Sequence, residues 1–236
     1  MCRPDVPTEQ PVEIASLRVD ESRGPSGGGM RVAGLTQVAT RPKSTSSRRG
    51  PLASPDTVRP MDPACTEHPI ASSYWAEPGK LLAGPHPGVG DRATQRATLR
   101  ALADAGIRTV VDLTTPRELP GVRVLWEKLA PDAEEWAWVG SPVLDGGIPS
   151  RAGMQLVLDT IDASCARGRP VYVHCMGGLG RAGTVVACWW IRHGLVQGEA
   201  VFDALTQRRV GQPNAHSISP ETGPQFRFIR AWAPGD

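Results

Sequence analysis

One cysteine and one arginine, separated by a glycine-rich turn, are the residues of this chain best suited to chemistry. Cys175 and Arg181 have five residues between them, and three of the five are glycine. A short apolar run at 171–173 precedes the turn and a longer one at 185–191 follows it, which predicts a buried strand and a buried helix. Backbone N–H groups converge in such a turn and the helix N-terminus adds partial positive charge. The sequence therefore predicts an anion site flanked by a thiol and a guanidinium.

Those two side chains suit covalent catalysis on a phosphate ester. A thiol attacks as the thiolate, which converging N–H groups and a nearby guanidinium favour. The planar fork of Arg181 can bind two oxygens of a phosphate, a geometry that lysine lacks. The substrate phosphate is expected to be bound by Arg181 and by the intervening residues Met176, Gly177, Gly178, Leu179 and Gly180.

Residues 174–181, His-Cys-Met-Gly-Gly-Leu-Gly-Arg, resemble the His-Cys-x-x-Gly-x-x-Arg signature of cysteine-dependent protein tyrosine and dual-specificity phosphatases. The similarity extends over roughly residues 75–232. It implies two steps: Cys175 attacks phosphorus to form a cysteinyl-phosphate, and water then hydrolyses that intermediate. It also implies that no metal or other cofactor is needed, and that His174 orients the loop by hydrogen bonding to backbone groups.

The resemblance also implies an aspartate on an upstream loop that protonates the leaving oxygen and later activates the water. Asp145, in the run Leu-Asp-Gly-Gly-Ile-Pro at 144–149, has the expected position and is our predicted general acid and base. The alternative is an aspartate that only stabilises a turn. Asp112 is the competing candidate, but it ends a predicted strand and is expected to order the turn at Thr114 and Thr115.

Two departures from the family pattern concern the second step. The family usually places Ser or Thr directly after the arginine, where its hydroxyl helps the sulfur leave, but this chain has Ala182, and Thr184 lies two positions further on. We therefore expect slow breakdown of the phosphoenzyme, by about 10-fold, the scale of one hydrogen bond. In the tyrosine-specific branch a late glutamine positions the attacking water. Here Glu221 aligns with it and Gln225 follows four residues later, so Gln225 serves this role or the segment is only a helix start.

The residues around the signature narrow the substrate class. The turn contains no lysine, which argues against multiply phosphorylated lipids or inositols and favours a phosphorylated protein or a small aryl phosphate. Trp75, Trp136 and Trp138 either flank a phosphotyrosine ring or belong to the core. Two other functions stay open: a rhodanese-like sulfurtransferase, against which the Gly-x-x-Arg ending argues, and a phosphate-binding module without turnover, suggested by Ala182.

Composition limits the other possibilities. The 26 basic and 24 acidic residues of this 236-residue chain give no argument for binding nucleic acid or membranes. The chain lacks an apolar run long enough for a spanning helix and an apolar secretory segment, so a cytoplasmic location is expected. Five scattered cysteines, without a Cys-x-x-Cys pair, do not describe a disulfide framework or a zinc site. His86, His193 and His216 are expected at surface or loop positions. The sequence does not indicate an oligomeric state.

Two regions are expected along the chain. Residues 1–66 are rich in Pro, Gly, Ser, Thr and Arg without apolar periodicity, and are predicted to be a disordered extension. Residues 67–236 are predicted to form a single α/β phosphatase domain, with a central, mostly parallel twisted sheet flanked by helices. Strands are expected near 74–75, 80–83, 107–113, 136–144 and 171–173. Helices are expected at 91–105, 117–129 and 150–165, from 185, at 201–209 and at 219–232.

Overall fold

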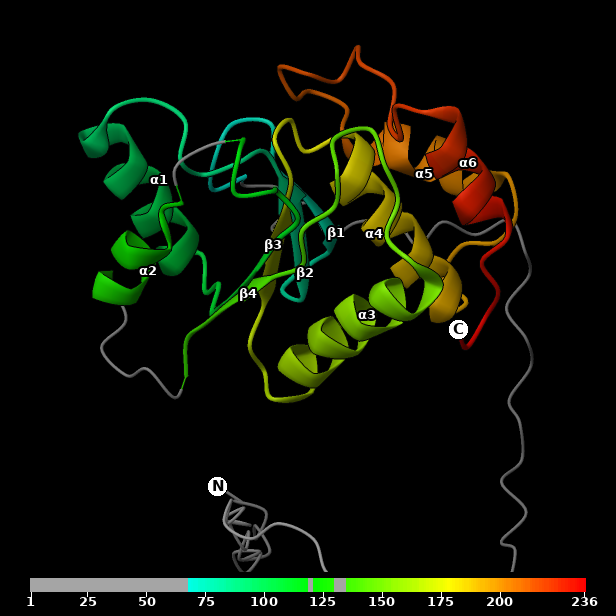
Figure 1. The fold of residues 1–236 in the computed structure, drawn as a ribbon, viewed down its shortest axis with the longest axis horizontal. Coiled ribbons are helices and arrows are strands. Elements are labelled where there is room, and N and C mark those ends of the chain that lie inside the picture. The colour runs from blue at the N-terminus through cyan, green and yellow to red at the C-terminus, as the bar shows by residue number, and fades with distance from the viewer. Residues whose placement is uncertain (1–67, 119–120, 130–134) are drawn as a thin grey trace, which may run out of the picture. The chain divides into compact units, whose positions relative to one another are not determined.

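The computed structural model describes residues 68–118, 121–129 and 135–236, so the predicted disordered extension lies outside the described part. Within that part, five strands form one sheet in the order β1-β2-β5-β3-β4 (Figure 1). The strands are β1 (Tyr74–Glu77), β2 (Leu81–Gly84), β3 (Thr109–Asp112), β4 (Ala137–Gly140) and β5 (Val171–His174). Strand β1 runs antiparallel to β2, and every other neighbouring pair is parallel. The predicted α/β fold with a mostly parallel sheet is confirmed.

Helices cover both faces of the sheet, as Figure 1 shows. On one side lie α1 (Arg92–Asp104) and α2 (Arg123–Leu129). On the other lie α3 (Arg151–Ala166), α4 (Gly180–Arg192), α5 (Ala200–Arg208) and α6 (Gly223–Arg230). Within the described ranges, every helix is too short or too polar to cross a lipid bilayer.

The alternation of side chains along the strands divides the core into two clusters. Leu81 and Ala83 of β2 pack with the α3–α6 side, whereas Leu82 between them packs with α1 and α2. In β5, Val171 and Val173 face the first group and Tyr172 the second. Strand β5 is thus covered on both faces, which fixes the position at which it ends and the glycine-rich turn begins.

Hydrogen-bonding side chains begin two helices where the sequence predicted them. Asp91 accepts from the N–H of Thr94 at 2.8 Å, and Ser150 accepts from the N–H of Gly153 at 3.0 Å. Both are N-cap contacts, which satisfy an N–H group that has no partner inside the helix. The Ser150 cap also defines the end of the loop that carries Asp145.

Three element boundaries differ from the prediction. Helix α2 begins at Arg123 and not at 117, and residues 142–144 form no strand. Helix α6 begins at Gly223 and not near 219. Its start is set by Gln225, whose Oε1 accepts from the N–H of Thr222, and by Pro224 in the first turn, where a missing N–H has no cost. Residues 219–222 are therefore a bent segment outside the helix, which remains available for other contacts.

Candidate active site

The predicted nucleophile lies at the carboxyl end of the central strand. Strand β5 ends at His174, Cys175 follows directly with 2% of its surface exposed, and α4 begins at Gly180. Arg181 therefore belongs to the first turn of α4, six residues after the sulfur. The carboxyl ends of parallel strands are where open α/β sheets bind ligands, so this turn, the phosphate loop (residues 175–181), stands at the expected edge.

The carbonyl groups of the phosphate loop are held by donors outside it. Three carbonyls accept from three separate segments: Met176 from the backbone N–H of His86 (3.0 Å), Gly177 from Asn214 Nδ2 (3.3 Å) and Leu179 from Ser219 Oγ (2.8 Å). In a trans peptide the carbonyl and the next N–H point in opposite directions. Because these carbonyls point outward, the following N–H groups turn to the inner side of the loop, where they form a cradle for an anion.

Gly178 allows the loop to lie directly against the end of β2. Its φ is +75°, and a Cβ at this position would lie 2.5 Å from the carbonyl carbon of Gly84. A side chain at position 178 is therefore excluded by backbone contact as well as by conformation. The turn after β2 thus supports the phosphate loop from behind.

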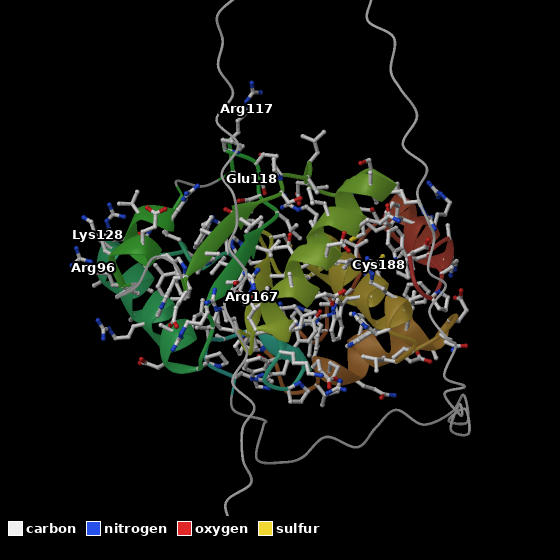
Figure 2. The ribbon with its side chains drawn as sticks, turned by 90° about the horizontal axis from the view of Figure 1, so that it is seen from below. Arg96, Arg117, Glu118, Lys128, Arg167 and Cys188 are labelled. Carbon is white, nitrogen blue, oxygen red and sulfur yellow. The ribbon has the colours of Figure 1, made fainter. Side chains whose placement is uncertain are left out.

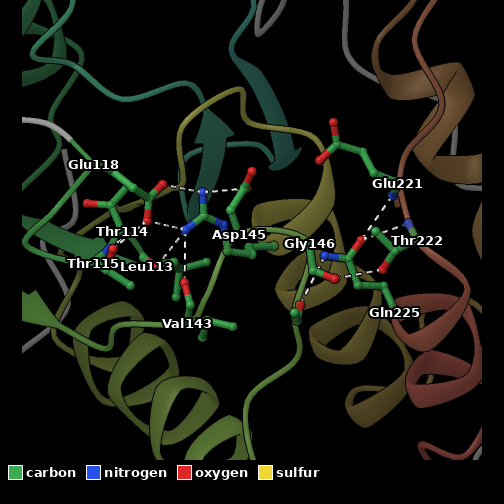
Figure 3. Close-up of polar contacts among 12 residues, drawn as sticks. Leu113, Thr114, Thr115, Glu118, Val143, Asp145, Gly146, Glu221, Thr222 and Gln225 are labelled. Atoms are coloured by element: carbon green, nitrogen blue, oxygen red, sulfur yellow. Dashed lines mark hydrogen bonds and ion pairs between the residues drawn. The ribbon is translucent and has the colours of Figure 1, made fainter.

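Arg181 is held in a fixed orientation by a bidentate ion pair (Figure 3). Its Nη1 and Nη2 donate to the two carboxylate oxygens of Glu118 at 2.8 and 2.6 Å. Nη1 also donates to the carbonyls of Val143 at 2.9 Å and Leu113 at 3.3 Å. The hydrogen bonds from Arg181 lower the pKa of Glu118 to about 2, so this carboxylate remains ionised at neutral pH. Only 3% of Arg181 is exposed.

Asp145 reaches the same guanidinium from the opposite side. Its Oδ1 lies 2.9 Å from Nη2 of Arg181, and its side chain is 76% exposed (Figure 3). Arg181 Nε is buried and has no hydrogen-bond partner among the described residues. Nε and Nη2 form the guanidinium edge that can bind two oxygens of a phosphate. The structure therefore brings Asp145 and Arg181 together beside the turn that begins at Cys175.

His174 is fully buried beneath the loop. Its ring stacks on Tyr172 with centroids 5.7 Å apart and meets His86 edge to face at 5.0 Å. Burial lowers the pKa of His174 to about 4, against the opposing effect of the Asp112 carboxylate. The imidazole is therefore neutral at pH 7 and packs as a ring. Its role in orienting the loop stays a prediction: neither ring nitrogen makes a hydrogen bond of normal geometry among the described residues, but the Cys175 backbone is close enough to oppose the lowering of the His174 pKa.

Comparison with known proteins agrees with this geometry. The model of the family described as Swiss Army Knife protein, DSP-PTPase phosphatase domain (PTP-SAK) matches residues 71–234. The chain belongs to this PTP-SAK phosphatase family. It has the dual-specificity and tyrosine phosphatase fold, and the sulfurtransferase alternative is not favoured.

Solved structures share the fold of this PTP-SAK domain at low identity. Tk-PTP in its active form has a TM-score of 0.55 and 24% identity, covering 67% of this chain and 94% of that one. Kinase associated phosphatase, solved with its catalytic cysteine replaced by serine, has a TM-score of 0.54 and 20% identity, covering 68% and 91%. PTPMT1 has a TM-score of 0.53 and 21% identity, covering 68% and 92%.

Curated relatives match the PTP-SAK domain over shorter stretches. A candidate tyrosine phosphatase of Invertebrate iridescent virus 3, named 067L, is 32% identical over 99 residues, 39% of this chain and 37% of that protein. The uncharacterized protein MJECL20 of Methanocaldococcus jannaschii is 48% identical over 48 residues, 20% of this chain and 33% of that protein. The chain spans about a third of the length of these relatives.

Asp112 and His86 of the PTP-SAK domain each accept hydrogen bonds within their own turns. Asp112 Oδ1 accepts from the N–H and the hydroxyl of Thr114, so it orders that turn as predicted. His86 was expected at a surface or loop position. It does lie in a loop, but only 2% of it is exposed, because the turn after β2 folds under the phosphate loop. Its Nδ1 accepts from the N–H of Gly88 at 2.8 Å.

Among the described residues, His86, Asp112 and His174 form a group whose spacing would suit a metal ion. One potential ligand atom from each lies within 4.8 Å of the others. However, His86 Nδ1 already accepts a hydrogen bond, so in the neutral ring the proton is on Nε2. A metal at Nε2 would require moving that proton to a nitrogen facing an N–H donor. The group therefore fits ring packing better than metal binding.

Residues near the start of α4 lack the hydroxyl that the family usually places after the arginine. Ala182 is buried, and the hydroxyl of Thr184 donates to the carbonyl of Gly180 at 2.7 Å. Thr184 is thus bonded within its own helix, as is common for threonine in helices. It leaves the sulfur of Cys175 without the usual hydroxyl donor from this helix.

Glu221 and Gln225 lie on the opposite side of the phosphate loop from Glu118. Gln225 is buried, its Oε1 accepts from the N–H groups of Glu221 and Thr222, and its Nε2 donates to the carbonyl of Gly147 at 3.0 Å. The Glu221 carboxylate faces Gly180 so closely that a Cβ there would collide with it. The water-positioning role of either residue stays a prediction, and both the oxygen and the nitrogen of the Gln225 amide already have partners.

The tryptophans and the other described cysteines belong to packing. Trp126 lies at the centre of an aromatic group: its ring centroid is 4.8 Å from that of Trp136 and 6.5 Å from that of Trp138. Trp75 is buried in the same cluster. Cys188 is buried among the side chains of α4 (Figure 2). Burial raises the pKa of Cys165 to about 11, which leaves that thiol protonated and unreactive.

Glu118 is the functional residue that the sequence analysis missed. A local signal was present: Glu118 Oε1 accepts from the N–H and hydroxyl of Thr115, three residues earlier, in a turn of its own. The neighbouring Arg117 points away from the body of the molecule (Figure 2). The turn thus directs Glu118 toward Arg181 and Arg117 away from it.

Proposed function

We propose that this phosphatase hydrolyses phosphate monoesters through a cysteinyl-phosphate, with Cys175 as nucleophile, Arg181 as phosphate clamp and Asp145 as general acid and base. The observation that carries the proposal is the Arg181 guanidinium, which Glu118 fixes on one edge, while Nη2 lies 2.9 Å from Asp145 Oδ1 and buried Nε has no hydrogen-bond partner among the described residues. One edge is used for orientation and the other remains for phosphate.

In the first step, the Cys175 thiolate attacks phosphorus, the S–P bond forms and the bond from phosphorus to the leaving oxygen breaks. Asp145 donates its proton to that oxygen. The inward N–H groups of Gly177, Gly178 and Gly180 and the Nε–Nη2 edge of Arg181 stabilise the negative charge on the three remaining oxygens.

In the second step, the Asp145 carboxylate takes a proton from water as the water oxygen attacks phosphorus. The S–P bond breaks, inorganic phosphate leaves and the Cys175 thiolate returns. Ala182 supplies no hydroxyl to the departing sulfur, so this step is proposed to limit turnover.

The proposed substrate is a phosphorylated protein, with phosphotyrosine or dual specificity, or a small aryl phosphate. The phosphate loop has no lysine, and the Asp145, Glu118 and Glu221 carboxylates disfavour a ligand with several phosphates. PTPMT1, which shares the fold, has been solved in complex with PI(5)P. A phosphoinositide is therefore included among the substrates to be tested.

The test is hydrolysis of 4-nitrophenyl phosphate, followed by panels of phosphotyrosine peptides, phosphoserine peptides and phosphoinositides. Activity is expected to persist in EDTA, to stop with vanadate and to disappear in Cys175→Ser while phosphate binding remains. Cys165→Ser is the matched control, because this thiol is protonated and lies outside the site. Binding of phosphate without any hydrolysis would instead identify a phosphate-binding module without turnover.

A further inference from the structure

One segment touches both loops of the proposed site. Residues 219–225 contact the phosphate loop at one end, where Ser219 Oγ donates to the Leu179 carbonyl at 2.8 Å. Further along, Thr222 Oγ1 donates to the carbonyl of Gly146 at 2.8 Å, and Gln225 Nε2 donates to the carbonyl of Gly147 at 3.0 Å. Figure 3 shows the last two contacts beside Asp145. The residues that accept these bonds directly follow Asp145 in the chain.

The loop that carries Asp145 (residues 144–149, the Asp145 loop) has its own turn. The N–H of Gly147 donates to the carbonyl of Leu144 at 2.9 Å, and Gly146, the third residue of this turn, has a φ of +69°. A positive φ at that position favours glycine. A Cβ at Gly147 would lie 2.9 Å from the same Leu144 oxygen. The two glycines thus define a tight turn. The carbonyl of Gly146 accepts from Thr222 and the carbonyl of Gly147 accepts from Gln225.

Gln225 is placed so that its two amide ends act on different partners. Its oxygen accepts from the N–H groups of Glu221 and Thr222, which fixes the start of α6, and its nitrogen donates to the Asp145 loop. The side chain is fully buried. A buried amide bonded at both ends holds one orientation, so the position of the Asp145 loop is tied to the start of α6.

We propose that Thr222 and Gln225 are positioning residues that hold the Asp145 loop closed over the phosphate loop. This inference rests on the proposed function for its effect on catalysis. The backbone beside Asp145 is anchored, while its exposed carboxylate is left to turn between Arg181 and a leaving oxygen. The segment acts on the chemistry through Asp145 and touches no substrate itself.

The sharpest variant is Gln225→Glu. A glutamate keeps the oxygen that accepts from Glu221 and Thr222 but loses the N–H that bonds Gly147, so it separates the helix cap from the loop contact. Thr222→Val removes the hydroxyl bond to Gly146 together with the capping contact that the Thr222 side chain accepts from the N–H of Gln225, and Thr222→Ser retains both. The matched controls are Gln207→Glu and Thr206→Val, the same chemical changes at exposed positions of α5.

Two substrates separate a loss of the acid from a general loss of structure. Phenyl phosphate has a weakly acidic leaving phenol and needs the Asp145 proton, whereas 4-nitrophenyl phosphate needs it much less. Gln225→Glu and Thr222→Val are expected to lower kcat/KM on phenyl phosphate about 10-fold and to change kcat/KM on 4-nitrophenyl phosphate by less than about 3-fold, since a general acid contributes about 10²–10⁴-fold. The ratio kcat/KM is compared because it reports the first step, whereas kcat is limited by the second. Thr222→Ser and both controls should match the parent. In an Asp145→Ala background the same changes should have no further effect.

Hydrogen exchange tests the anchoring without any turnover. The amides of residues 145–148 are expected to exchange faster in Gln225→Glu and Thr222→Val than in the parent and the controls. Faster exchange in a protein that hydrolyses neither substrate would retain the anchoring and reject the proposed function. Unchanged exchange, equal loss on both substrates, or an effect that persists without Asp145 would overturn the inference. If Gln225→Glu does not fold, Thr222→Val alone decides.

Discussion

Asp145 Oδ1 lies 2.9 Å from Arg181 Nη2, one of the two nitrogens of the guanidinium edge that could bind a phosphate. Glu118 occupies the other edge. The Asp145 carboxylate and a bound phosphate would therefore compete for Nη2. Substrate binding on this edge would release Asp145 from the ion pair and leave it beside the leaving oxygen. The general acid would then be freed only when a phosphate is bound.

Asp145→Asn should therefore have opposite effects on binding and rate. Exposed ion pairs contribute about 0.2–1 kcal/mol, so phosphate should bind roughly 2- to 5-fold more tightly, while kcat on phenyl phosphate falls by about 100-fold or more. Calorimetric titration with inorganic phosphate and steady-state rates measure the two effects. Asp159→Asn, which breaks the ion pair of Asp159 with Arg192 away from the site, should change neither. Weaker phosphate binding in Asp145→Asn would contradict the competition.

Glu118→Gln should disorder the phosphate clamp. The amide loses the charged bidentate contact with Arg181, and hydrogen bonds to charged groups contribute about 1.5–3 kcal/mol, so kcat/KM should fall about 10- to 100-fold. Glu127→Gln, which removes an exposed partner of Arg123, is the control. Parent-like kcat/KM in Glu118→Gln would show that Arg181 is oriented by the carbonyls of Leu113 and Val143 alone.

Ala182→Ser should speed the second step. The parent is expected to show a burst of phenol close to one per enzyme followed by slow turnover, because the phosphoenzyme accumulates. The added hydroxyl should raise the steady rate about 10-fold and shrink the burst. Rapid-mixing kinetics with 4-nitrophenyl phosphate measures both. Ala187→Ser, the same change deeper in buried α4, controls for the polar atom. A parent without a burst would remove the basis for this expectation.

Stability should fall as pH drops from about 6.5 to about 4 because of His174. Burial lowers the pKa of His174 from 6.5 to about 4, so within this window the unfolded chain binds the proton and the folded chain does not. Burial lowers the pKa of His86 as well, which adds to the same trend. Thermal unfolding of His174→Asn should depend less on pH across the window, whereas exposed His216→Asn should follow the parent. Identical pH slopes for His174→Asn and the parent would contradict this assignment.

The sheet and the phosphate loop were predictable because their signals are local. Short apolar runs identified the strands, and the apolar run after Arg181 identified buried α4. The cap at Ser150 required only neighbouring residues. In each case the physical cause acts within a few residues, so it is visible in the order of the amino acids.

The contacts between loops were not predictable in the same way. Glu118 lies 63 residues before Arg181, and nothing in the local pattern relates the two. The burial of His86 and the bonds from Thr222 and Gln225 to the Asp145 loop also depend on how distant turns meet at one edge of the sheet. The predicted start of α6 was wrong by four residues. The Gln225 cap and Pro224, which set the true start, lie inside the segment that the sequence pattern assigned to the helix.

The three carbonyl anchors of the phosphate loop come from both sides of it along the chain: His86 is made long before Cys175, and Asn214 and Ser219 long after. During synthesis, the thiol is thus in place before two of its three supports have emerged. A ribosome-bound chain that stops at Arg209 carries Cys175 but lacks two of these donors, so the set of three contacts is complete only after Ser219 has been synthesised.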